Sequence, residues 1–417
     1  MQDISLRDVR QFVNEKLGLG KRIAALRDGR RKPQISATTV FEAVLYGTLV
    51  GAESLLAVDQ LLKQSDLGEV LGIERSPLVS DSTMIRCLGT MKPEAIRALL
   101  RIAACEALKM ALLEGEPLRL GRYRVVAVDM SHMAGRKAVV ARYVGPAFEV
   151  TLDFEILRKK ENEVTAAKRL FERIVSELGD LFDVVVVDGL YTQWFIQRAR
   201  QVGKHVVVKS REKEKNFTLV RRGEQWIRVH RRYGVHPTAG VDEDGYKSYR
   251  YMEIDPQTDE LLAEPIRMVK VWEERIKGRQ ERDEHWLLST LPREEAAPEL
   301  LRHIARRRWG IENGAFRTVS QNHKAKRRGT QQGKAAEVRV GILLLSEMIL
   351  RVYTWYKQTR WKSPRSRRAS WQSVQKLLLR SIPPLREVRG LRPVGQPHWG
   401  LQSIRQPMRP TGTDPSG

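Results

Sequence analysis

Apolar residues recur every three or four positions through the first part of the chain. The pattern is clear at residues 39–46 and again at 96–100, where it would give a helix one apolar face. Residues 80–82, Ser-Asp-Ser, precede another stretch of this kind and are typical of helix N-termini. These patterns predict a helical N-terminal domain over residues 1–115.

Two valine-rich runs further along the chain each end in a carboxylate. Residues 124–129 lead to Asp129, and residues 183–188 lead to Asp188. Continuous β-branched runs of this length are typical of strands that are buried on both faces of a sheet. The two runs therefore predict two central strands with an aspartate at the end of each.

The order of elements around these runs predicts how the sheet is arranged. Two more strands follow the first run, and then come an amphipathic helix, the second run, a shorter helix and a last strand, at residues 138–144, 148–157, 164–181, 183–188, 192–202 and 205–209. This is the element order of an RNase H-like α/β fold, a mixed sheet flanked by helices. Strand–helix–strand crossovers are right-handed and give parallel pairing, so the first and fourth strands can lie side by side. Asp129 and Asp188 would then emerge together at the carboxyl ends of the sheet.

The remaining segments interrupt or follow this core, which we assign to residues 116–210 and 291–356. Residues 211–290 contain charge-rich, alternating runs separated by turns, and they predict a β-rich insertion that includes a strand at 225–230. A helix is predicted from Pro298, because proline is favoured in the first helical turn. A further helix at about 335–356 is expected to pack on the core, and 357–417 is predicted to be a basic, partly disordered tail.

The charge of the chain points to an acidic partner. The chain has 74 Lys and Arg against 50 Asp and Glu, a formal net charge of +24. Such an excess favours nucleic acid, because neutralising phosphates releases counterions. Residues 351–417 carry 14 Lys or Arg against two acidic residues, which is about half of the net charge. The tail is either a solvated arm or a DNA contact, and the basic N-terminal domain is either a DNA-binding module or a packing bundle.

Cysteine content and hydropathy indicate the compartment. Only Cys87 and Cys105 occur, too few for a disulfide framework or a cysteine zinc site, and a reducing cytoplasm fits. The N-terminus has no signal-peptide pattern. The most apolar run, 340–350, is too short to span a bilayer and predicts a buried helix.

Three carboxylates in this order suggest a site for hard metal ions. Two divalent ions about 3.5–4 Å apart can activate an attacking oxygen and stabilise a leaving one during phosphodiester cleavage. Mg²⁺ prefers oxygen ligands, chiefly carboxylates. Asp129 and Asp188 at adjacent strand ends and Glu312 on a following helix would supply them. Other acids could replace one of the aspartates: Glu149, Asp153 and Asp183.

Three segments resemble the catalytic motifs of a known family. Residues 126–129 (Val-Ala-Val-Asp), 186–191 (Val-Val-Asp-Gly-Leu-Tyr) and 308–313 (Arg-Trp-Gly-Ile-Glu-Asn) are similar to the three motifs of bacterial insertion-sequence DDE transposases. Residues 211–290 resemble the β-strand insertion that one branch of this family carries before the catalytic Glu. The resemblance covers about residues 120–350, and its most discriminating part is the third motif.

The resemblance implies an activity, cofactors and partners. It implies a cytoplasmic, nucleoid-associated bacterial enzyme of DNA transposition and DNA recombination that cuts and joins DNA at insertion-sequence ends. Asp129, Asp188 and Glu312 would be the catalytic residues and the ligands of two Mg²⁺ or Mn²⁺ ions. Arg308 would hold a DNA phosphate; its pairing with Glu312 on the helix surface is the alternative. The partners would be the double-stranded DNA of the terminal inverted repeats and the target, bound by a homodimer or larger assembly, with no membrane involved.

Some positions depart from the family motif. The family has a Tyr three residues before Arg308 and a Lys seven residues after Glu312, where this chain has Ala305 and Val319. The resemblance also implies that an insertion tryptophan stacks on an extruded base. Lys324 and Lys326 are the candidates to replace the missing Lys in contacting DNA, and Trp226, Trp272 and Trp286 are the candidates for the stacking tryptophan. A non-catalytic, transposase-derived DNA-binding protein and a structure-specific nuclease on the same fold stay open as alternatives.

Overall fold

The chain divides into two units, Met1–Pro384 and Leu385–Gly417, and every described residue belongs to the first. The computed structural model describes residues 4–73, 79–211, 218–232, 236–241, 247–257, 262, 264–275, 282–310, 333–360 and 371–382.

The N-terminal part is helical, as its periodicity predicts. Its helices are α1 (Leu6–Glu15), α2 (Gly20–Ala24), α3 (Ala37–Leu49), α4 (Leu55–Gln64), α5 (Leu67–Leu71), α6 (Asp81–Thr90) and α7 (Pro93–Leu113). A serine side chain accepts a backbone N–H bond at the start of four of them, namely Ser5, Ser36, Ser54 and Ser80. Such caps satisfy donors that the first helical turn leaves unpaired. The helix start predicted at 80–82 is confirmed.

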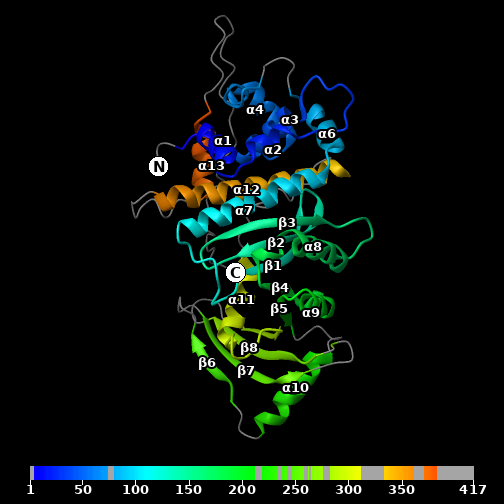
Figure 1. Cartoon of the computed structure of the whole chain (residues 1–417), viewed down its shortest axis with the longest axis vertical. Helices are drawn as coiled ribbons and strands as arrows, with labels where there is room; N and C mark the ends of the chain where they lie inside the picture. Colours follow the sequence, from blue (N-terminus) through cyan, green and yellow to red (C-terminus); the bar gives the residue numbers. More distant parts are fainter. Residues whose placement is uncertain are drawn as a thin grey trace, which may run out of the picture. The chain divides into compact units, whose positions relative to one another are not determined.

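A nine-stranded mixed sheet follows, and the protein is therefore of the mixed α/β class (Figure 1). The strands are β1 (Val125–Met133), β2 (Arg136–Val144), β3 (Glu149–Ile156), β4 (Val184–Asp188), β5 (His205–Arg211), β6 (Thr238–Val241), β7 (Lys247–Gln257), β8 (Ile266–Arg275) and β9 (Arg282–Ser289). Their order across the sheet is β3-β2-β1-β4-β5-β9-β8-β7-β6. The pairs β1/β4 and β4/β5 are parallel, and the other neighbours are antiparallel.

The register of the central pair brings Asp129, in the middle of β1, and Asp188, at the end of β4, to one level. Val125 lies opposite Val184, and Ala127 lies opposite Val186. Asp129 and Asp188 each follow two residues after that last pair. The predicted neighbourhood of the first and fourth strands is confirmed.

Helices cover this sheet and tie it to the N-terminal part (Figure 1). Helix α8 (Glu163–Leu178) packs on β2 and β3, and α9 (Thr192–Gln201) packs on β4 and β5. Helix α11 (Pro298–Gly310) contacts β1, β4, β5 and β9. The long helix α12 (Lys334–Arg360) contacts β3 as well as α3, α6 and α7.

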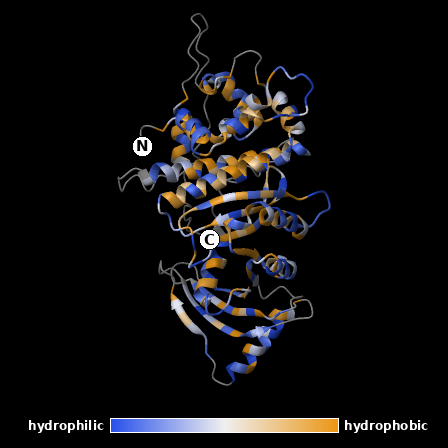
Figure 2. Cartoon of the chain, in the orientation of Figure 1, coloured by the Kyte–Doolittle hydropathy of each residue, from blue (hydrophilic) through white to orange (hydrophobic). Residues whose placement is uncertain are grey.

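Apolar residues concentrate where α7 and α12 run along each other and along β3 (Figure 2). The apolar run predicted to be a buried helix lies inside α12, where Ile342, Leu344 and Leu345 are fully buried. Within the parts of the chain that the structure describes, none of the helices is both long enough and apolar enough to traverse a lipid bilayer.

The segment predicted as a strand at 225–230 is helical, and that prediction was wrong. It belongs to α10 (Thr218–Arg231), which packs on β7. Its buried residues Leu219, Gly223 and Ile227 recur every four positions, which is a helical period. The short alternation at 225–230 masked that longer period. A Cβ on Gly223 would lie 2.6 Å from the ring of Trp286, so α10 approaches the sheet closely there.

The β-rich insertion is not a separate sheet. Strand β9 pairs with β5, so the four insertion strands extend the central sheet.

Part of the predicted tail is also folded. Helix α13 (Trp371–Arg380) buries Val374 and Leu378 and contacts α12. The side chain of Gln375 donates to the Leu49 carbonyl at 3.2 Å.

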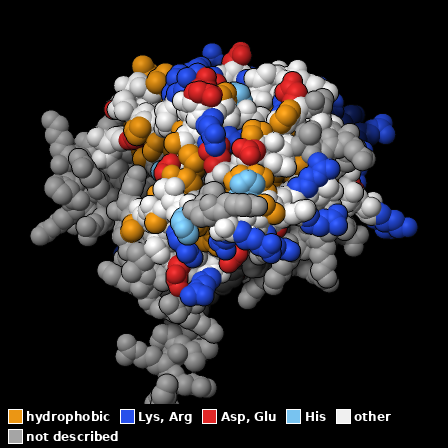
Figure 3. Space-filling model, turned by 90° about the horizontal axis from the view of Figure 1, so that it is seen from below, with side chains coloured by type: hydrophobic (Ala, Val, Ile, Leu, Met, Phe, Trp, Pro, Cys, Tyr) orange, Lys and Arg blue, Asp and Glu red, His pale blue; other side chains and the backbone are white. Residues whose placement is uncertain are grey.

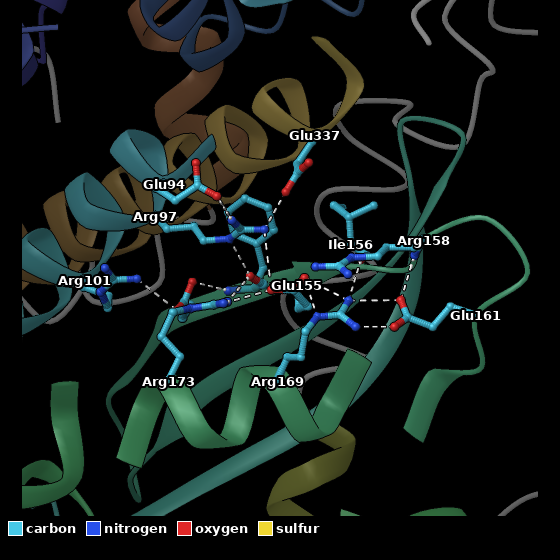
Figure 4. Close-up of polar contacts among 12 residues, drawn as sticks. Glu94, Arg97, Arg101, Glu155, Ile156, Arg158, Glu161, Arg169, Arg173 and Glu337 are labelled. Atoms are coloured by element: carbon cyan, nitrogen blue, oxygen red, sulfur yellow. Dashed lines mark hydrogen bonds and ion pairs between the residues drawn. The ribbon is translucent and has the colours of Figure 1, made fainter. Parts of the chain in front are cut away.

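An ionic network fixes the edge strand β3 to three helices (Figure 4). Asp153 is fully buried and accepts from Arg101 of α7 at 3.0 Å and from Arg173 of α8 at 2.6 Å. The neighbouring Glu155 pairs with Arg173 at 2.9 Å, and Arg97 pairs with Glu337 of α12. Buried charges are tolerated when each is paired in this way, so the network sets how the sheet edge meets the helices.

Candidate active site

Asp129 and Asp188 hold their carboxylates in the same way. The Oδ1 atom of Asp129 accepts from the Met130 backbone N–H at 2.9 Å, and the Oδ1 atom of Asp188 accepts from the Gly189 backbone N–H at 2.7 Å. In both residues the Oδ2 atom is turned to the same partner, the guanidinium of Arg308. The two aspartates are therefore oriented alike on adjacent strands, just beyond the last parallel pair of β1 and β4. The prediction that the first strand ends at Asp129 was wrong, because β1 continues to Met133 in its antiparallel pairing with β2.

Arg308 joins the two carboxylates. Its Nη1 atom lies 2.7 Å from Asp129 Oδ2, and its Nη2 atom lies 3.8 Å from Asp188 Oδ2. The Arg308 side chain is 3% exposed, that of Asp129 is 9% exposed, and that of Asp188 is 41% exposed. The sequence predicted a DNA phosphate or Glu312 as the partner of Arg308, and in this structure Arg308 contacts both Asp129 and Asp188.

Helix α11 positions Arg308 beside the aspartates. The face of this helix that packs on the sheet carries both apolar residues and a buried arginine. Leu301, Ile304 and Ala305 are buried on it. Arg302, also buried, pairs with Glu273 at 2.8 Å and lies over the ring of Tyr249 at 3.9 Å. These contacts hold the helix on the sheet, and its last turn places Arg308 next to Asp129 and Asp188.

Lys209 extends the charged site by one strand, and sequence reasoning missed it. It lies opposite Asp188 in the parallel β4/β5 register. Its Nζ atom is 3.0 Å from Asp283 Oδ2. Burial lowers the pKa of Lys209 and Arg308 lowers it further, while Asp283 opposes both. The available signal was the position of this lysine at the end of the valine run at 206–208, level with Asp188.

Tyr191 lies close enough to Asp129 and Asp188 for their charges to affect its pKa. It is buried and its hydroxyl donates to Glu163. Burial and the bond to Glu163 raise the pKa of Tyr191, and the charges of Asp129 and Asp188 raise it further. The phenol therefore stays protonated and keeps its hydrogen bond to Glu163.

The three rival acids have other partners. Asp183 begins the run at the opposite end of β4 and pairs with Arg124 at 2.6 Å. Glu149 lies 3.5 Å from Arg142, and Asp153 pairs with Arg101 and Arg173. The geometry favours Asp129 and Asp188 over these three.

The donor set suits a hard cation, although its third predicted member cannot be placed. Glu312, Lys324, Lys326 and Val319 lie outside the described residues. Within the described ranges, no group of three or more His, Cys, Asp or Glu side chains is arranged to hold a metal ion. Two carboxylate oxygens directed at one positive group are nevertheless the kind of ligand that Mg²⁺ or Mn²⁺ takes. Asp129 and Asp188 therefore fit a divalent metal.

The three tryptophan candidates differ in exposure. Trp286 is fully buried and donates to Glu224 at 2.8 Å, so it has no ring face to offer to a base. Trp226 is half-buried and stacks on His230, with ring centroids 3.6 Å apart. Trp272 is half-buried beneath Arg231, at 5.2 Å. Only the last two keep surface near solvent.

The end of the described structure that carries α10 has mixed charge. Figure 3 shows Lys and Arg side chains interspersed there with acidic, histidine and apolar ones. On this face the basic side chains do not form one continuous surface.

Neither the models of known protein families nor the curated protein sequences give a match to this chain. The function is therefore inferred from the site.

Proposed function

We propose that this protein is a DDE transposase with an RNase H-like core, which cuts and joins DNA at the ends of an insertion sequence. The observation that carries the proposal is the convergence of Asp129 and Asp188. Their Oδ2 atoms come from strands 59 residues apart in the sequence and face one guanidinium, at 2.7 and 3.8 Å. Carboxylate oxygens gathered from adjacent strands are what metal-dependent phosphoryl transfer requires.

The arrangement of the sheet supports the RNase H-like part of the proposal. Strands β3, β2 and β1 are antiparallel neighbours, and β4 and β5 continue in parallel from β1. Five strands in this order, with helices between β3 and β4 and between β4 and β5, agree with the element order expected from the sequence.

Each residue has a stated role in the proposed reaction. Asp129 and Asp188 hold the metal ions, and Glu312, assigned from the sequence resemblance alone, is the third ligand. Two Mg²⁺ or Mn²⁺ ions supply activation of the attacking oxygen and stabilisation of the leaving oxygen. Cleavage and joining are both in-line displacements at phosphorus, so one set of ligands serves both.

The charge of the chain supports DNA as the partner. The net charge of +24 favours a polyanion. We propose that a homodimer or larger assembly in the bacterial cytoplasm brings the two inverted repeats together, because both ends must be cut and joined to one target.

The test is metal-dependent cleavage and joining of DNA that carries the sequences flanking the gene, where the proposal places the terminal inverted repeats. We expect activity with Mg²⁺ or Mn²⁺ and a loss of activity of more than about a hundredfold in Asp129→Asn and Asp188→Asn. Even residues that only orient the metal ligands typically cost about 10–100-fold when they are replaced, and the ligands themselves should cost more. Asp183→Asn is the matched control, since Asp183 directly precedes the strand that ends at Asp188 but pairs with Arg124. It should keep cleavage activity.

Other results would point to the alternatives. Binding of end DNA without cleavage by the unaltered protein would favour a non-catalytic DNA-binding protein, which the departures at Ala305 and Val319 also favour. Cleavage without joining would favour a nuclease. Equal activity in Asp188→Asn and the unaltered protein would refute the proposed site.

A further inference from the structure

Arg308 occupies the position at which the two aspartates would receive a cation. Its two terminal nitrogens face one Oδ2 atom each, while the Oδ1 atoms are taken by backbone N–H groups. The side chain is almost completely enclosed. The guanidinium therefore neutralises two carboxylates that would otherwise repel each other.

A divalent ion and this guanidinium compete for the same oxygens. A positive charge at contact distance from both ligands opposes the approach of a second cation. The two contacts differ, however. Asp129 is enclosed and 2.7 Å from Arg308, whereas Asp188 is 41% exposed and 3.8 Å away. The contact of Arg308 with Asp188 is longer and more exposed to solvent than its contact with Asp129. Displacement of the arginine therefore begins at Asp188.

We propose that Arg308 is an internal substitute for the metal: it holds Asp129 and Asp188 together in the DNA-free protein and opposes metal binding until a DNA phosphate draws its guanidinium away. The inference rests on the proposed function, because it takes DNA as the substrate. Arginine binds phosphate through two parallel hydrogen bonds, so a phosphate replaces both contacts that Arg308 gives up. Metal binding and DNA binding are then coupled, and each strengthens the other by the same factor.

The coupling is measured by the binding of Mn²⁺ to the full chain, followed from the electron paramagnetic resonance signal of free Mn²⁺. Without DNA, Arg308→Gln should bind Mn²⁺ at least about tenfold more tightly than the unaltered protein, because a repelling charge is gone. Addition of duplex DNA should tighten Mn²⁺ binding to the unaltered protein about tenfold or more and should change Arg308→Gln by less than about twofold.

Arg307→Gln is the matched control. Arg307 is the preceding residue of the same helix, but its Nη2 atom lies 3.3 Å from His303 Nε2 and not at the aspartates. It should leave the Mn²⁺ affinity unchanged. Arg308→Lys is the second variant, for use if Arg308→Gln does not fold. A single ammonium cannot face both carboxylates as a guanidinium does, so this variant should fall between the unaltered protein and Arg308→Gln.

Two results would overturn the inference: DNA-free Mn²⁺ affinity that is no higher in either Arg308 variant, or DNA that tightens Mn²⁺ binding equally in all proteins. If the unaltered protein still cuts end DNA in that case, the proposed function stands and the role of Arg308 falls. Suppose instead that Arg308→Gln binds Mn²⁺ more tightly than the unaltered protein, and that DNA tightens Mn²⁺ binding to the unaltered protein but hardly changes it in the variant. If no protein then cuts DNA, the coupling stands and the transposase proposal falls.

Discussion

Arg142 on β2 is a fully buried guanidinium, and its partner Glu347 lies 205 residues further along the chain, on α12. The two are 3.3 Å apart, and Arg351 approaches the same carboxylate at 2.9 Å. Arg308 and Asp129 repeat the pattern between α11 and β1. In each case a buried charge on a strand is matched by one on a distant helix, so these pairs fix how helix and sheet meet.

Glu347→Gln tests the first of these pairs. Burial raises the pKa of Glu347, but Arg142 and Arg351 outweigh burial and hold the pKa below its ordinary value of 4.5. A depressed folded pKa means that the stabilisation is present above pH 4.5 and is lost as the pH falls through the folded pKa. We expect the substitution to lower the free energy of unfolding by about 3 kcal/mol at pH 7, and the difference to shrink below pH 4.5.

Urea unfolding at neutral and acidic pH measures both effects. Glu177→Gln is the control, because Glu177 pairs with Arg101 but is 43% exposed, and its loss should cost less than about 1 kcal/mol. If Glu347→Gln lowers the free energy of unfolding by the same amount at both pH values, Glu347 does not stabilise the fold through its negative charge.

Helix α12 contacts several elements of different kinds, among them the helices α3, α6 and α7 and the strand β3. The contact is close at Gly341, where a Cβ would lie 2.6 Å from Ile96 Cγ2 and 2.9 Å from Phe154 Cζ. Glycine lets three elements meet at one point there. The helix itself was predictable from its apolar run, but this crossing was not.

Gly341→Ala should therefore lower the free energy of unfolding by about 1–3 kcal/mol, because the added methyl overpacks the crossing. This is opposite to the gain of about 1 kcal/mol that alanine normally gives over glycine within a helix. Gly89→Ala in α6 is the control: the nearest atom to its Cβ is the Ala335 Cβ at 4.0 Å, so a gain of about 0.5–1 kcal/mol is expected. Urea unfolding of both variants would show opposite signs, and a gain in both would refute the close crossing.

For the whole molecule, local patterns were enough to predict the central strands and the convergence of Asp129 and Asp188. They were enough because buried valine runs and crossover handedness depend on near neighbours. The same patterns missed that the insertion joins the central sheet, because strand pairing between β5 and β9 depends on residues about 80 positions apart. They also missed the contact of Arg308 with the two aspartates and the place of Lys209, since both depend on packing between separate elements.

The salt dependence of DNA binding tests how the whole molecule uses its positive charge. Several arginines are committed to internal pairs, as in Figure 4, so fewer than the 74 Lys and Arg side chains are available to DNA. Even six to ten phosphate contacts would make binding fall by about 10³–10⁵ between about 50 and 200 mM salt. We expect a fall of at least about a thousandfold for duplex DNA, measured by fluorescence anisotropy. An affinity that hardly changes with salt would refute DNA binding through phosphates.

Removal of residues 385–417 separates the two interpretations of the tail. This unit carries five arginines, Glu387 and Asp414. Each arginine that contacts a phosphate contributes about 0.9 to the slope of the logarithm of the binding constant against the logarithm of salt concentration. If the segment binds DNA, its removal should lower the slope by about 1–4 while the midpoint of thermal unfolding of Met1–Pro384 stays unchanged. An unchanged slope would show that the segment is a solvated arm and that the phosphate contacts come from the remainder of the chain.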